Sequence, residues 1–459
     1  MVQESPYQTI DPTTGGRVAE FPFHSADKIA ATMRRASRAF QTWRETPPRE
    51  RVAPLSRLAQ LLIEQQSALA ALMTLEMGKP VREATAEIEK CAWLCRYYAE
   101  HAADFLQPVR VTSDATRSMI CYEPLGIVLG IMPWNFPFWQ VFRWAVPTLC
   151  AGNTVLLKHA SNVPQCARMI DALFLKANYP PGTFQSLFPS RALLERMIAD
   201  CTIRGLSLTG STAVGKHVAM AAAQTLKKCV FELGGSDPFL VLDDADLAQV
   251  VPMAVRARMQ NAGQSCIAAK RFLVAETRYQ AFLDAYVAAV VTLRVGDPRL
   301  PDTDIGPLAR GDLVVHLDAQ VRGATRAGAT VLTGGHRMGT SGFFYAPTVL
   351  SDVTETLPIF SEEVFGPVAL VTPMTSMAEG IRLANLTPYG LGASIWTRDV
   401  TRGEVIARSL EAGAVFINEI VKSDPRLPFG GVKESGYGRE LSDIGLHEFT
   451  NIKTVWIGA

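Results

Sequence analysis

The sequence predicts an α/β protein whose parallel sheets are covered by helices on both faces. Helix-like and strand-like segments alternate along most of the chain, as expected of parallel strands joined by helical crossovers. The strand-like segments are short and almost continuously apolar, which is typical of strands buried on both faces. The length of 459 residues is too great for one ordinary core, so two or three domains are expected.

The first half of the chain begins with helices and continues with strands. Apolar residues recur at helical spacing over 26–44, 49–76 and 81–105. The run "MICYEPLGIVLGIMP" predicts a strand, a turn and a buried strand. Further short apolar runs predict strands over 153–160, 184–188, 204–211 and 227–235, with a helix that starts at Thr212.

The second half of the chain repeats the alternation. The predicted elements are helices over 247–259 and 278–292, and strands over 271–276 and within 343–353, 367–374 and 412–419. The segment 428–440 is rich in glycine and is expected to be a loop. The last segment, 449–458, alternates in the manner of an edge strand, and an edge strand at a chain end invites pairing with another chain.

The composition argues against several classes of protein. The net charge is +1, from 45 basic and 44 acidic residues, and no basic stripe indicates a nucleic-acid partner. The uncharged run 124–142 is long enough to span a bilayer, but its three prolines and Asn135 predict a buried strand, a turn and a helix start, so no membrane span is expected. The first residues lack the features of a secretory signal, and the eight cysteines have neither framework nor zinc spacing. We therefore expect a cytoplasmic protein without a metal site.

Three short motifs contain residues suited to catalysis. "NAGQSC" ends in Cys266, which is either a buried spacer or a nucleophile. "FELGGSDP" places Glu232 at the end of an apolar strand, as a surface cap or as a base. "PWNFP" holds Asn135 in a rigid turn, where its amide either satisfies the turn or stabilises charge. A cysteine nucleophile needs a low thiol pKa, an oxyanion donor and a base, and these residues meet the demands only if the fold brings them together.

A fourth motif, "GSTAVGKH", resembles a phosphate-binding P-loop in Gly210, Gly215 and Lys216. A P-loop continues with Ser or Thr to hold magnesium, whereas this chain has His217, which disfavours a nucleotide triphosphatase. The helix that begins after Ser211 still has free N–H groups that can face a phosphate, and an ordinary strand-to-helix turn is the alternative. No G-x-G-x-x-G follows a predicted strand, so the usual dinucleotide fingerprint is absent.

Six motifs together resemble the aldehyde dehydrogenase superfamily, in that family's order and spacing over nearly the whole chain. They are "PWNFP", "LTGSTAVGK", "FELGGSDP", "GQSC", "EEVFGPV" and "PFGGVKESGYGRE". The resemblance implies a Rossmann-type cofactor domain, an α/β catalytic domain and a β-strand arm that joins subunits, so a homodimer or homotetramer is expected. The implied ranges are 1–105 and 125–234 for the cofactor-binding domain, 235–444 for the catalytic domain, and 106–124 and 445–459 for the oligomerisation arm.

The resemblance also assigns roles to the three catalytic candidates. Cys266 is the expected nucleophile, which attacks an aldehyde to give a thiohemiacetal and, after hydride transfer, a thioester. The Asn135 side-chain amide and the Cys266 backbone N–H are expected to hold the oxyanion. Glu232 is expected to activate the water that releases a carboxylic acid. Ala268 stands where some relatives have a second cysteine, so no local disulfide with Cys266 can form.

The resemblance further implies a bound nicotinamide dinucleotide. The positions that match the family's cofactor contacts are Trp134, Lys158, Ser161, Gly210, Ser211, Leu233, Glu363 and Phe365. Many relatives carry a glutamate three residues after the equivalent of Lys158, where this chain has Ser161. A carboxylate repels the 2′-phosphate of NADP, whereas a serine can donate a hydrogen bond to it. NADP is therefore the expected cofactor, with NAD as the alternative.

Three residues suggest which aldehyde is the substrate. Arg143 lies just beyond Asn135, near the family's substrate tunnel, with Trp139 as a tunnel wall and Ser423 as a second contact. An arginine there favours a carboxylate at the far end of the substrate, and the combination is similar to the NADP-dependent succinate-semialdehyde dehydrogenases. Some members of that branch have another arginine where this chain has Gln260, which leaves glutarate semialdehyde and other ω-oxo acids open. Arg143 as a surface or salt-bridged residue, and a non-catalytic binding or structural protein with this fold, are the remaining alternatives.

Overall fold

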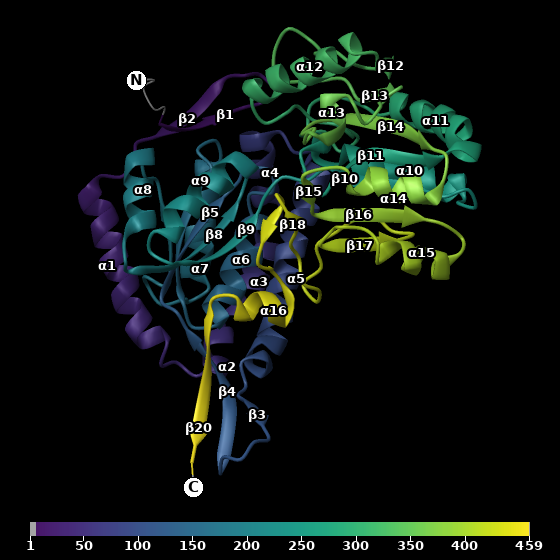
Figure 1. Ribbon diagram of the computed structural model, residues 1–459. Coiled ribbons are helices and arrows are strands. Elements are labelled where there is room, and N and C mark those ends of the chain that lie inside the picture. The colour runs from purple at the N-terminus through teal and green to yellow at the C-terminus, as the bar shows by residue number, and fades with distance from the viewer. Residues whose placement is uncertain (1–5, 459) are drawn as a thin grey trace.

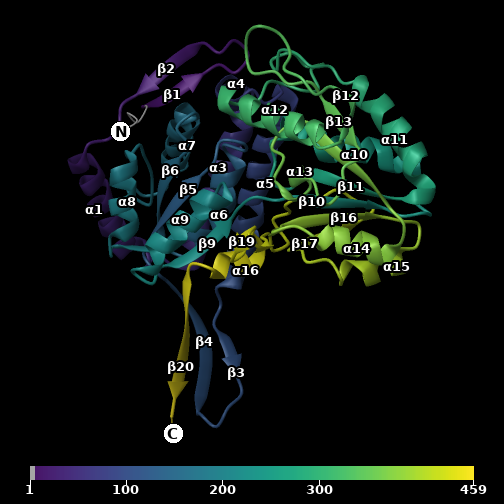
Figure 2. The ribbon, with the colours of Figure 1, turned by 45° about the horizontal axis from the view of Figure 1, so that its top comes forward.

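Two large sheets lie side by side in the protein, and a narrow antiparallel sheet projects below one of them (Figure 1). The computed structural model describes residues 6–458. Figure 2 shows the six-stranded sheet and its helices as one half of the molecule and the seven-stranded sheet with its helices as the other. The expected α/β class, with mainly parallel sheets, is confirmed.

The six-stranded sheet is parallel except at one edge. Its order is β19-β9-β8-β5-β6-β7, and only β19 runs antiparallel to its neighbour. Strand β5 is buried along its whole length because helices cover both faces, which accounts for its apolar sequence IVLGIM. The strands of this sheet are β5 (Ile127–Met132), β6 (Thr154–His159), β7 (Phe184–Leu187), β8 (Ile203–Thr209), β9 (Lys228–Glu232) and β19 (Gly436–Tyr437).

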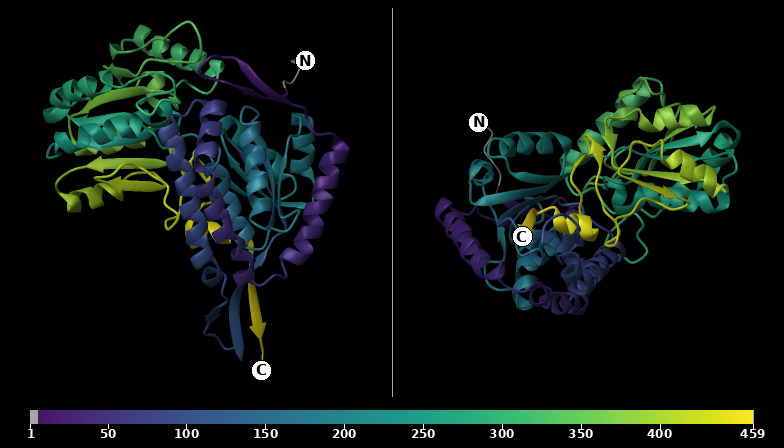
Figure 3. Two further views of the ribbon diagram at one scale, coloured as in Figure 1. Left: turned by 180° about the vertical axis from the view of Figure 1, so that it is seen from behind. Right: turned by 60° about the horizontal axis from the view of Figure 1, so that its bottom comes forward.

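Alternate residues of β5 pack against helices on opposite faces of this sheet. Ile127, Leu129 and Ile131 share a core with α1, α8 and α9, whereas Val128 and Met132 share a core with α3 to α7. Seen from behind, the long helices of the N-terminal segment cover that second face (Figure 3). These helices are α1 (Ala26–Trp43), α2 (Pro48–Val52), α3 (Pro54–Glu64), α4 (Gln66–Met77), α5 (Val81–Phe105), α6 (Trp139–Cys150), α7 (Pro164–Lys176), α8 (Arg191–Ala199) and α9 (Thr212–Ala223).

The seven-stranded sheet has the order β12-β13-β14-β11-β10-β16-β17 and is parallel except for β12. Its strands are β10 (Asp237–Val241), β11 (Ala269–Ala275), β12 (Thr330–Thr333), β13 (Thr348–Ser351), β14 (Val368–Met374), β16 (Gly392–Trp396) and β17 (Ala414–Ile417). The helices around it are α10 (Leu247–Met259), α11 (Glu276–Val291), α12 (Gly311–Arg326), α13 (Pro358–Ser361), α14 (Met377–Asn385) and α15 (Val400–Ala407). A separate apolar core fills this half, so each sheet is stabilised by its own buried surface.

The projecting sheet joins the end of the chain to an early segment. Its antiparallel order is β20-β4-β3, and β20 exposes most of its side chains. The strands are β3 (Val109–Val111), β4 (Arg117–Pro124) and β20 (Thr450–Ile457), and α16 (Ser442–His447) precedes the last of them. Two smaller pairings complete the fold: β1 (Tyr7–Ile10) with β2 (Arg17–Phe21), and β15 (Tyr389–Gly390) with β18 (Val432–Lys433).

Most predicted elements occur within a few residues of their expected bounds, and α1, α5 and α10 match the predicted helices closely. The single helix predicted over 49–76 is instead α2, α3 and α4. Pro54 begins α3 because proline fits a first helical turn but cannot continue the hydrogen bonds of a preceding helix. The glycine-rich segment 428–440 is not entirely a loop, since it contains the two-residue strands β18 and β19.

No strand is predicted for β10 or β16, although both lie near the middle of the second sheet. Pro238 in β10 and the small residues of β16 weaken the local strand signal. The domain ranges remain a prediction, and one pairing bears on them. Strand β19 lies within 235–444, the expected catalytic domain, yet it pairs with β9 of the first sheet.

Candidate active site

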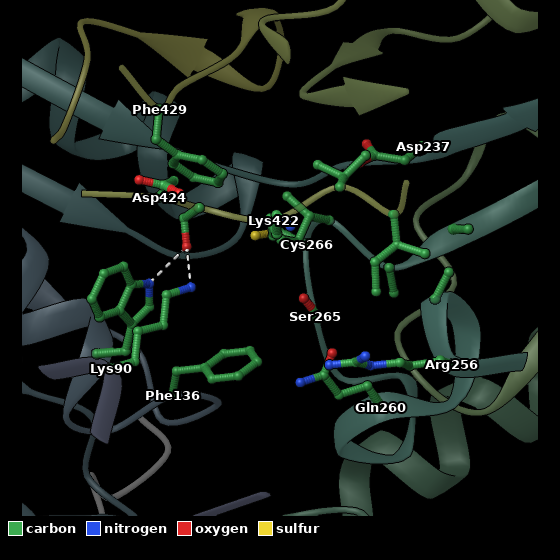
Figure 4. Close-up of a pocket in the computed structure, with 18 of the residues that line it drawn as sticks. Lys90, Phe136, Asp237, Arg256, Gln260, Ser265, Cys266, Lys422, Asp424 and Phe429 are labelled. Carbon is green, nitrogen blue, oxygen red and sulfur yellow. Dashed lines mark hydrogen bonds between the residues drawn. The ribbon is translucent and has the colours of Figure 1, made fainter. Parts of the chain in front are cut away.

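A cavity of about 480 Å³ opens between the two halves of the protein. It is lined by residues from α5, α6, β10 and α10, and by the loops that precede β11 and follow β17. Cys266, Trp139, Arg143 and Ser423 all line this cavity, so the fold brings four of the predicted site residues together. Figure 4 shows Cys266 and Lys90 among its walls.

Cys266 stands in a short loop just before β11. The Lys270 ammonium holds this loop by donating hydrogen bonds to the carbonyl oxygens of Ser265 (3.1 Å), Cys266 (2.7 Å) and Ala268 (3.0 Å). Gly235 permits the close approach of the strand end that contains Glu232, because a Cβ on Gly235 would lie 2.5 Å from the Cys266 carbonyl oxygen. Packing against the cysteine loop therefore requires a glycine at the second glycine position of "ELGG".

Asn135 lies in the turn between β5 and α6, beside the cysteine loop. Its Nδ2 donates a 3.1 Å hydrogen bond to the carbonyl oxygen of Gln264, two residues before Cys266. Asn261 Nδ2 donates back to the Asn135 carbonyl oxygen at 2.8 Å. A side-chain amide has two N–H groups, so the second one on Asn135 is available to a ligand. The expected oxyanion donor is thus attached to the loop of the expected nucleophile.

Two buried side chains fix the Asn135 turn. One carboxylate oxygen of Glu87 accepts hydrogen bonds from the backbone N–H groups of Phe138 and Trp139, both at 2.9 Å, at the N-terminus of α6, where negative charge is favourable. His159 Nε2 donates to the Pro137 carbonyl oxygen at 2.9 Å while its Nδ1 accepts from the next backbone N–H. Burial lowers the pKa of His159 to about 4, so this ring is neutral near neutral pH.

The turn before the cysteine loop is strained. Asn261 and Ala262 have φ values of 55° and 52°, in the left-handed region that costs a non-glycine residue about 1–2 kcal/mol. A carboxylate oxygen of Glu83 accepts a 2.7 Å hydrogen bond from the Asn261 backbone N–H, and Gln264 Nε2 donates to the Asn261 carbonyl oxygen at 3.1 Å. These hydrogen bonds hold the strained turn in the conformation that presents Cys266 to the cavity.

Glu232 ends β9 and is only 1% exposed. Among residues 6–458, neither of its carboxylate oxygens has a hydrogen-bond partner. Burial raises the pKa of Glu232 well above its usual range, the Arg143 guanidinium opposes this rise, and the carboxyl of Glu440 adds to it. A buried carboxyl group without partners is costly for the fold and is typical of a reacting group.

Burial also disfavours the thiolate form of Cys266, the form that a cysteine nucleophile needs. Burial raises its pKa to about 12, the nearby Arg143 and Lys270 cations oppose the rise, and the Glu232 and Glu363 carboxyls add to it. Glu232 is therefore close enough to Cys266 to raise the pKa of its thiol. A proton must leave this site before the sulfur can attack a carbonyl group.

Arg143 is 2% exposed on α6 and forms an ion pair with Glu440. Its guanidinium also lies 4.6 Å from the centre of the Phe429 ring. The structure thus contains the salt bridge that the sequence left open as an alternative, and the charge of Arg143 is already balanced inside the protein. Its contact with a substrate carboxylate stays a prediction.

The other predicted substrate residues meet at one wall of the cavity. Ser423 Oγ accepts hydrogen bonds from Trp139 Nε1 at 3.0 Å and from Lys90 Nζ at 2.9 Å, drawn as dashed lines in Figure 4. The Lys90 ammonium also lies 4.2 Å from the centre of the Trp139 ring. Gln260 lines the same cavity at the end of α10.

Part of the predicted cofactor site lies at the carboxyl ends of the first sheet. Lys158 is near the end of β6 and the exposed Ser161 is in the turn that follows. Gly210 and Ser211 connect β8 to α9, and Ser211 precedes this helix without a side-chain hydrogen bond to its first turn. Ligands of open α/β sheets bind at such strand ends, with phosphates at helix N-termini.

The remaining predicted cofactor residues come from other segments. Glu363 Oε1 accepts a 3.0 Å hydrogen bond from the Gly235 backbone N–H, and the Phe365 ring meets the Trp134 ring edge-on, with 5.8 Å between centres. Leu233 directly follows Glu232 and packs where Gly215 of α9 leaves room. These residues fit a nicotinamide dinucleotide, because polar groups for phosphates and hydroxyls lead to apolar rings beside the cysteine loop.

Sequence reasoning missed four charged residues that shape the site: Lys270, Glu87, Glu440 and Lys90. Two adjacent charges, Lys270 and Arg271, near the start of the buried strand β11 could have drawn attention to Lys270. Glu440 ends the motif "PFGGVKESGYGRE", but nothing in that motif indicates its pairing with Arg143. No local signal marks Glu87 or Lys90, because their partners lie far away in the sequence. Lys90 and Glu87 are two of many polar residues on the long helix α5.

The structure also bears on metals and membranes. Within residues 6–458, no group of three His, Cys, Asp or Glu side chains is placed to hold a metal ion. In the same part of the chain, no helix is both long and apolar enough to cross a membrane. The uncharged run 124–142 forms β5, a turn and the start of α6, as the sequence predicts.

Comparisons with known proteins agree with this architecture. The sequence profile described as "Aldehyde dehydrogenase family" matches residues 1–455. A probable succinate-semialdehyde dehydrogenase [NADP(+)] of Synechocystis sp. is 50% identical, over 98% of this chain and 99% of the relative. The succinate semialdehyde dehydrogenase [NAD(P)+] Sad of Escherichia coli is 45% identical, over 98% and 97% of the two chains. The crystal structure of succinic semialdehyde dehydrogenase from Streptococcus pyogenes in complex with NADP+ superimposes with a TM-score of 0.97 at 36% identity, covering 99% of this chain and 100% of that one. This protein therefore belongs to the aldehyde dehydrogenase family.

Proposed function

We propose that the protein oxidises succinate semialdehyde to succinate with reduction of NADP. The observation that carries the proposal is a single cavity with a cysteine in one wall and with hydrogen-bonding and cationic groups in another. Such a cavity suits a short aldehyde whose opposite end is a carboxylate. The names of the relatives from Synechocystis sp. and Streptococcus pyogenes support the same substrate and cofactor.

The reaction begins at Cys266. Its sulfur, once deprotonated, forms a bond to the aldehyde carbon, and the carbonyl oxygen becomes an oxyanion in a thiohemiacetal. The second N–H of the Asn135 amide and the Cys266 backbone N–H stabilise this oxyanion. An amide suits the task because it donates a hydrogen bond without transferring its proton.

Hydride loss from the former aldehyde carbon converts the thiohemiacetal to a thioester. The nicotinamide ring, when bound, supplies the acceptor for this hydride. Glu232 then removes a proton from a water molecule whose oxygen bonds to the thioester carbon. The bond between this carbon and the Cys266 sulfur breaks, so the sulfur remains on the enzyme as a thiolate and the carboxylic acid is released. Arg143 supports the ionised form of Glu232, because its cation opposes the effect of burial on the pKa of that carboxyl.

The cofactor preference rests on Ser161. The serine is exposed in the turn after β6, with Lys158 near the end of the strand, so a 2′-phosphate would meet a hydroxyl donor and a cation rather than a carboxylate. Gly210, Ser211, Leu233, Glu363, Phe365 and Trp134 complete the proposed cofactor site. NAD remains the alternative cofactor, and the printed name of the Escherichia coli relative includes both dinucleotides.

The substrate end of the site comprises Arg143, Trp139 and Ser423. Gln260 leaves this end with one arginine fewer than some relatives have, so glutarate semialdehyde is the competing substrate. Membership of an enzyme family argues against a non-catalytic binding or structural protein.

We also propose a cytoplasmic homodimer or homotetramer. The edge strand β20 exposes Ile452 (60%) and Trp456 (53%), which suits pairing with a second copy of the projecting sheet. All eight cysteines are unpaired, as expected in a reducing compartment. The proposed domains are a cofactor-binding domain (1–105 and 125–234), a catalytic domain (235–444) and an oligomerisation arm (106–124 and 445–459).

The test is a comparison of initial rates, followed by the absorbance of the reduced cofactor. Succinate semialdehyde, glutarate semialdehyde and butanal are each assayed with NADP and with NAD. The proposal expects the highest kcat/KM for succinate semialdehyde with NADP. A higher value for butanal would refute the carboxylate specificity, and a higher value with NAD would refute the role of Ser161.

A further inference from the structure

We propose that Lys90 determines the specificity for aldehydes that carry a carboxylate, by binding that carboxylate together with the Ser423 hydroxyl. The inference rests on the proposed function and names a residue that no motif contains. Lys90 lies on α5 and lines the same cavity as Cys266 (Figure 4). The argument depends on the hydrogen bonds of Ser423, on the charge balance of the cavity and on the position of Lys90.

The hydrogen bonds of Ser423 leave its hydroxyl only one further role. A serine hydroxyl has two acceptor lone pairs and one donor proton. Both lone pairs are used, by Trp139 Nε1 at 3.0 Å and by Lys90 Nζ at 2.9 Å. The remaining O–H can therefore only donate, and an anionic oxygen is its best partner. The hydrogen bonds from Lys90 and Trp139 therefore leave the Ser423 hydroxyl to donate a hydrogen bond to a carboxylate.

The charge balance of the cavity also indicates that Lys90 binds a carboxylate. The cationic residues that line it are Lys90, Arg143, Arg256, Lys422 and Arg426. Three of them have carboxylate partners inside the protein: Arg143 with Glu440, Lys422 with Glu419, and Arg426 with Asp424. Arg256 is exposed to solvent. Lys90 is partly buried, and no carboxylate among residues 6–458 forms an ion pair with it.

The nearest acidic groups do not neutralise Lys90. Glu87 pairs with Lys79, and Asp424 pairs with Arg426. An ammonium group carries three N–H donors, of which Ser423 accepts one. The other two are free to bind one or both oxygens of a substrate carboxylate. Such a contact would compensate for the arginine that Gln260 replaces.

The protonation of Lys90 fits a binding role that depends on pH. Burial lowers the pKa of Lys90 to about 8, and the facing groups are Arg143, which lowers this pKa further, and Cys91, Glu87 and Asp424, which raise it. The ammonium form therefore predominates at neutral pH and binds an anion there. It is lost as the pH rises past about 8.

The experiment measures the ratio of kcat/KM for succinate semialdehyde to kcat/KM for butanal, which has the same four carbons but no carboxylate. Lys90→Met keeps the length of the side chain and removes its charge. The ratio should fall about 10- to 100-fold, the effect of one hydrogen bond to a charged group, and Lys90→Arg should restore most of it. Arg96→Met is the matched control, since it removes an exposed cation from the same helix and should leave the ratio unchanged.

Four outcomes would overturn the inference. Equal losses for both aldehydes in Lys90→Met would mean that Lys90 only supports the fold. A ratio that is retained in Lys90→Met but collapses in Arg256→Met would transfer the role to the cation on the opposite side of Figure 4. If the unaltered enzyme does not prefer succinate semialdehyde, both the proposed function and the proposed role of Lys90 are refuted. If the preference persists in Lys90→Met, only the proposed role of Lys90 is refuted. If Lys90→Met does not fold, the unaltered enzyme still tests the role of Lys90. Its ratio of kcat/KM for succinate semialdehyde to kcat/KM for butanal must fall as the pH rises past about 8.

Discussion

The reacting wall and the recognition wall of the cavity are built in different ways. The reacting wall is the part of the cavity that holds Cys266; Asn135 and Glu232 lie behind it beside the cysteine loop, and each of the three comes from a short motif at a turn or a strand end. The recognition wall combines Lys90 and Ser423, which are 333 positions apart in the sequence. No motif marks this second pair, and its geometry exists only where α5 meets the loop after β17.

The polar groups of the two walls also differ in how they are satisfied. Glu232 is buried without a hydrogen-bond partner, and burial raises the pKa values of both Glu232 and the Cys266 thiol, so burial disfavours the charged forms of both groups. Lys90 and Ser423 are hydrogen-bonded to each other and keep donor protons for a ligand. Changes at the reacting wall should therefore affect every aldehyde, whereas changes at the recognition wall should affect only aldehydes with a carboxylate.

The largest expected effect comes from removing the nucleophile. Cys266→Ala should reduce kcat for both succinate semialdehyde and butanal by about 10⁴-fold or more, as the loss of a covalent nucleophile typically does. Steady-state rates with NADP measure the effect. Cys201→Ala is the control, because that cysteine is exposed and outside the cavity. Substantial turnover in Cys266→Ala would assign the chemistry to another group.

The next effect concerns the oxyanion donor. Asn135→Ala should lower kcat for both aldehydes by roughly 10²–10³-fold, the usual cost of losing one such donor. Because Asn135 also holds the cysteine loop through Gln264, the rate of Cys266 alkylation by iodoacetamide checks that the loop is intact. If kcat fell only for succinate semialdehyde, Asn135 would contribute to substrate recognition, and the distinction between the two walls would be wrong.

A change at the cofactor site should leave both walls unaffected. Ser161→Glu should raise the KM for NADP by about 10- to 100-fold, since a carboxylate repels the 2′-phosphate, and should change the KM for NAD much less. Ser161 is exposed, so the substitution should not disturb folding. Ser161→Ala separates repulsion from loss of the hydroxyl and should have the smaller effect. Equal KM changes for the two cofactors would contradict the assignment.

The smallest effect is a dependence on pH that separates the two walls. Raised pKa values of Cys266 and Glu232 mean that kcat/KM for both aldehydes should increase with pH, so this increase cancels in their ratio. The lowered pKa of Lys90 means that its charge is present below about 8 and lost above it. The ratio of succinate semialdehyde to butanal should be level below that pH and fall by up to about tenfold per pH unit above it.

Lys90→Arg provides the control for this pH dependence. A guanidinium group stays charged throughout the accessible range, so the variant should keep a level ratio. A decline that persists in Lys90→Arg would assign the titration to another group.

Much of the fold could be predicted from the sequence because its signals are local. The periodicity of α1, α5 and α10 and the apolar run of β5 follow from which faces are buried. The boundary at Pro54 and the strands β10 and β16 were not predicted. The two strands depend on neighbouring strands that supply hydrogen bonds and packing, whereas the break at Pro54 is a local signal, because proline cannot continue the hydrogen bonds of a preceding helix.

The sequence by itself determined the α/β class, the family resemblance and the candidate trio of Cys266, Asn135 and Glu232. These residues occur in short motifs in which the backbone geometry and the chemistry depend on adjacent positions. Only the tertiary structure decided that Arg143 is paired with Glu440 and that Lys90 stands beside Ser423. The physical reason is that a charge is neutralised or left available by whatever packs against it, and packing joins segments that are far apart in the chain.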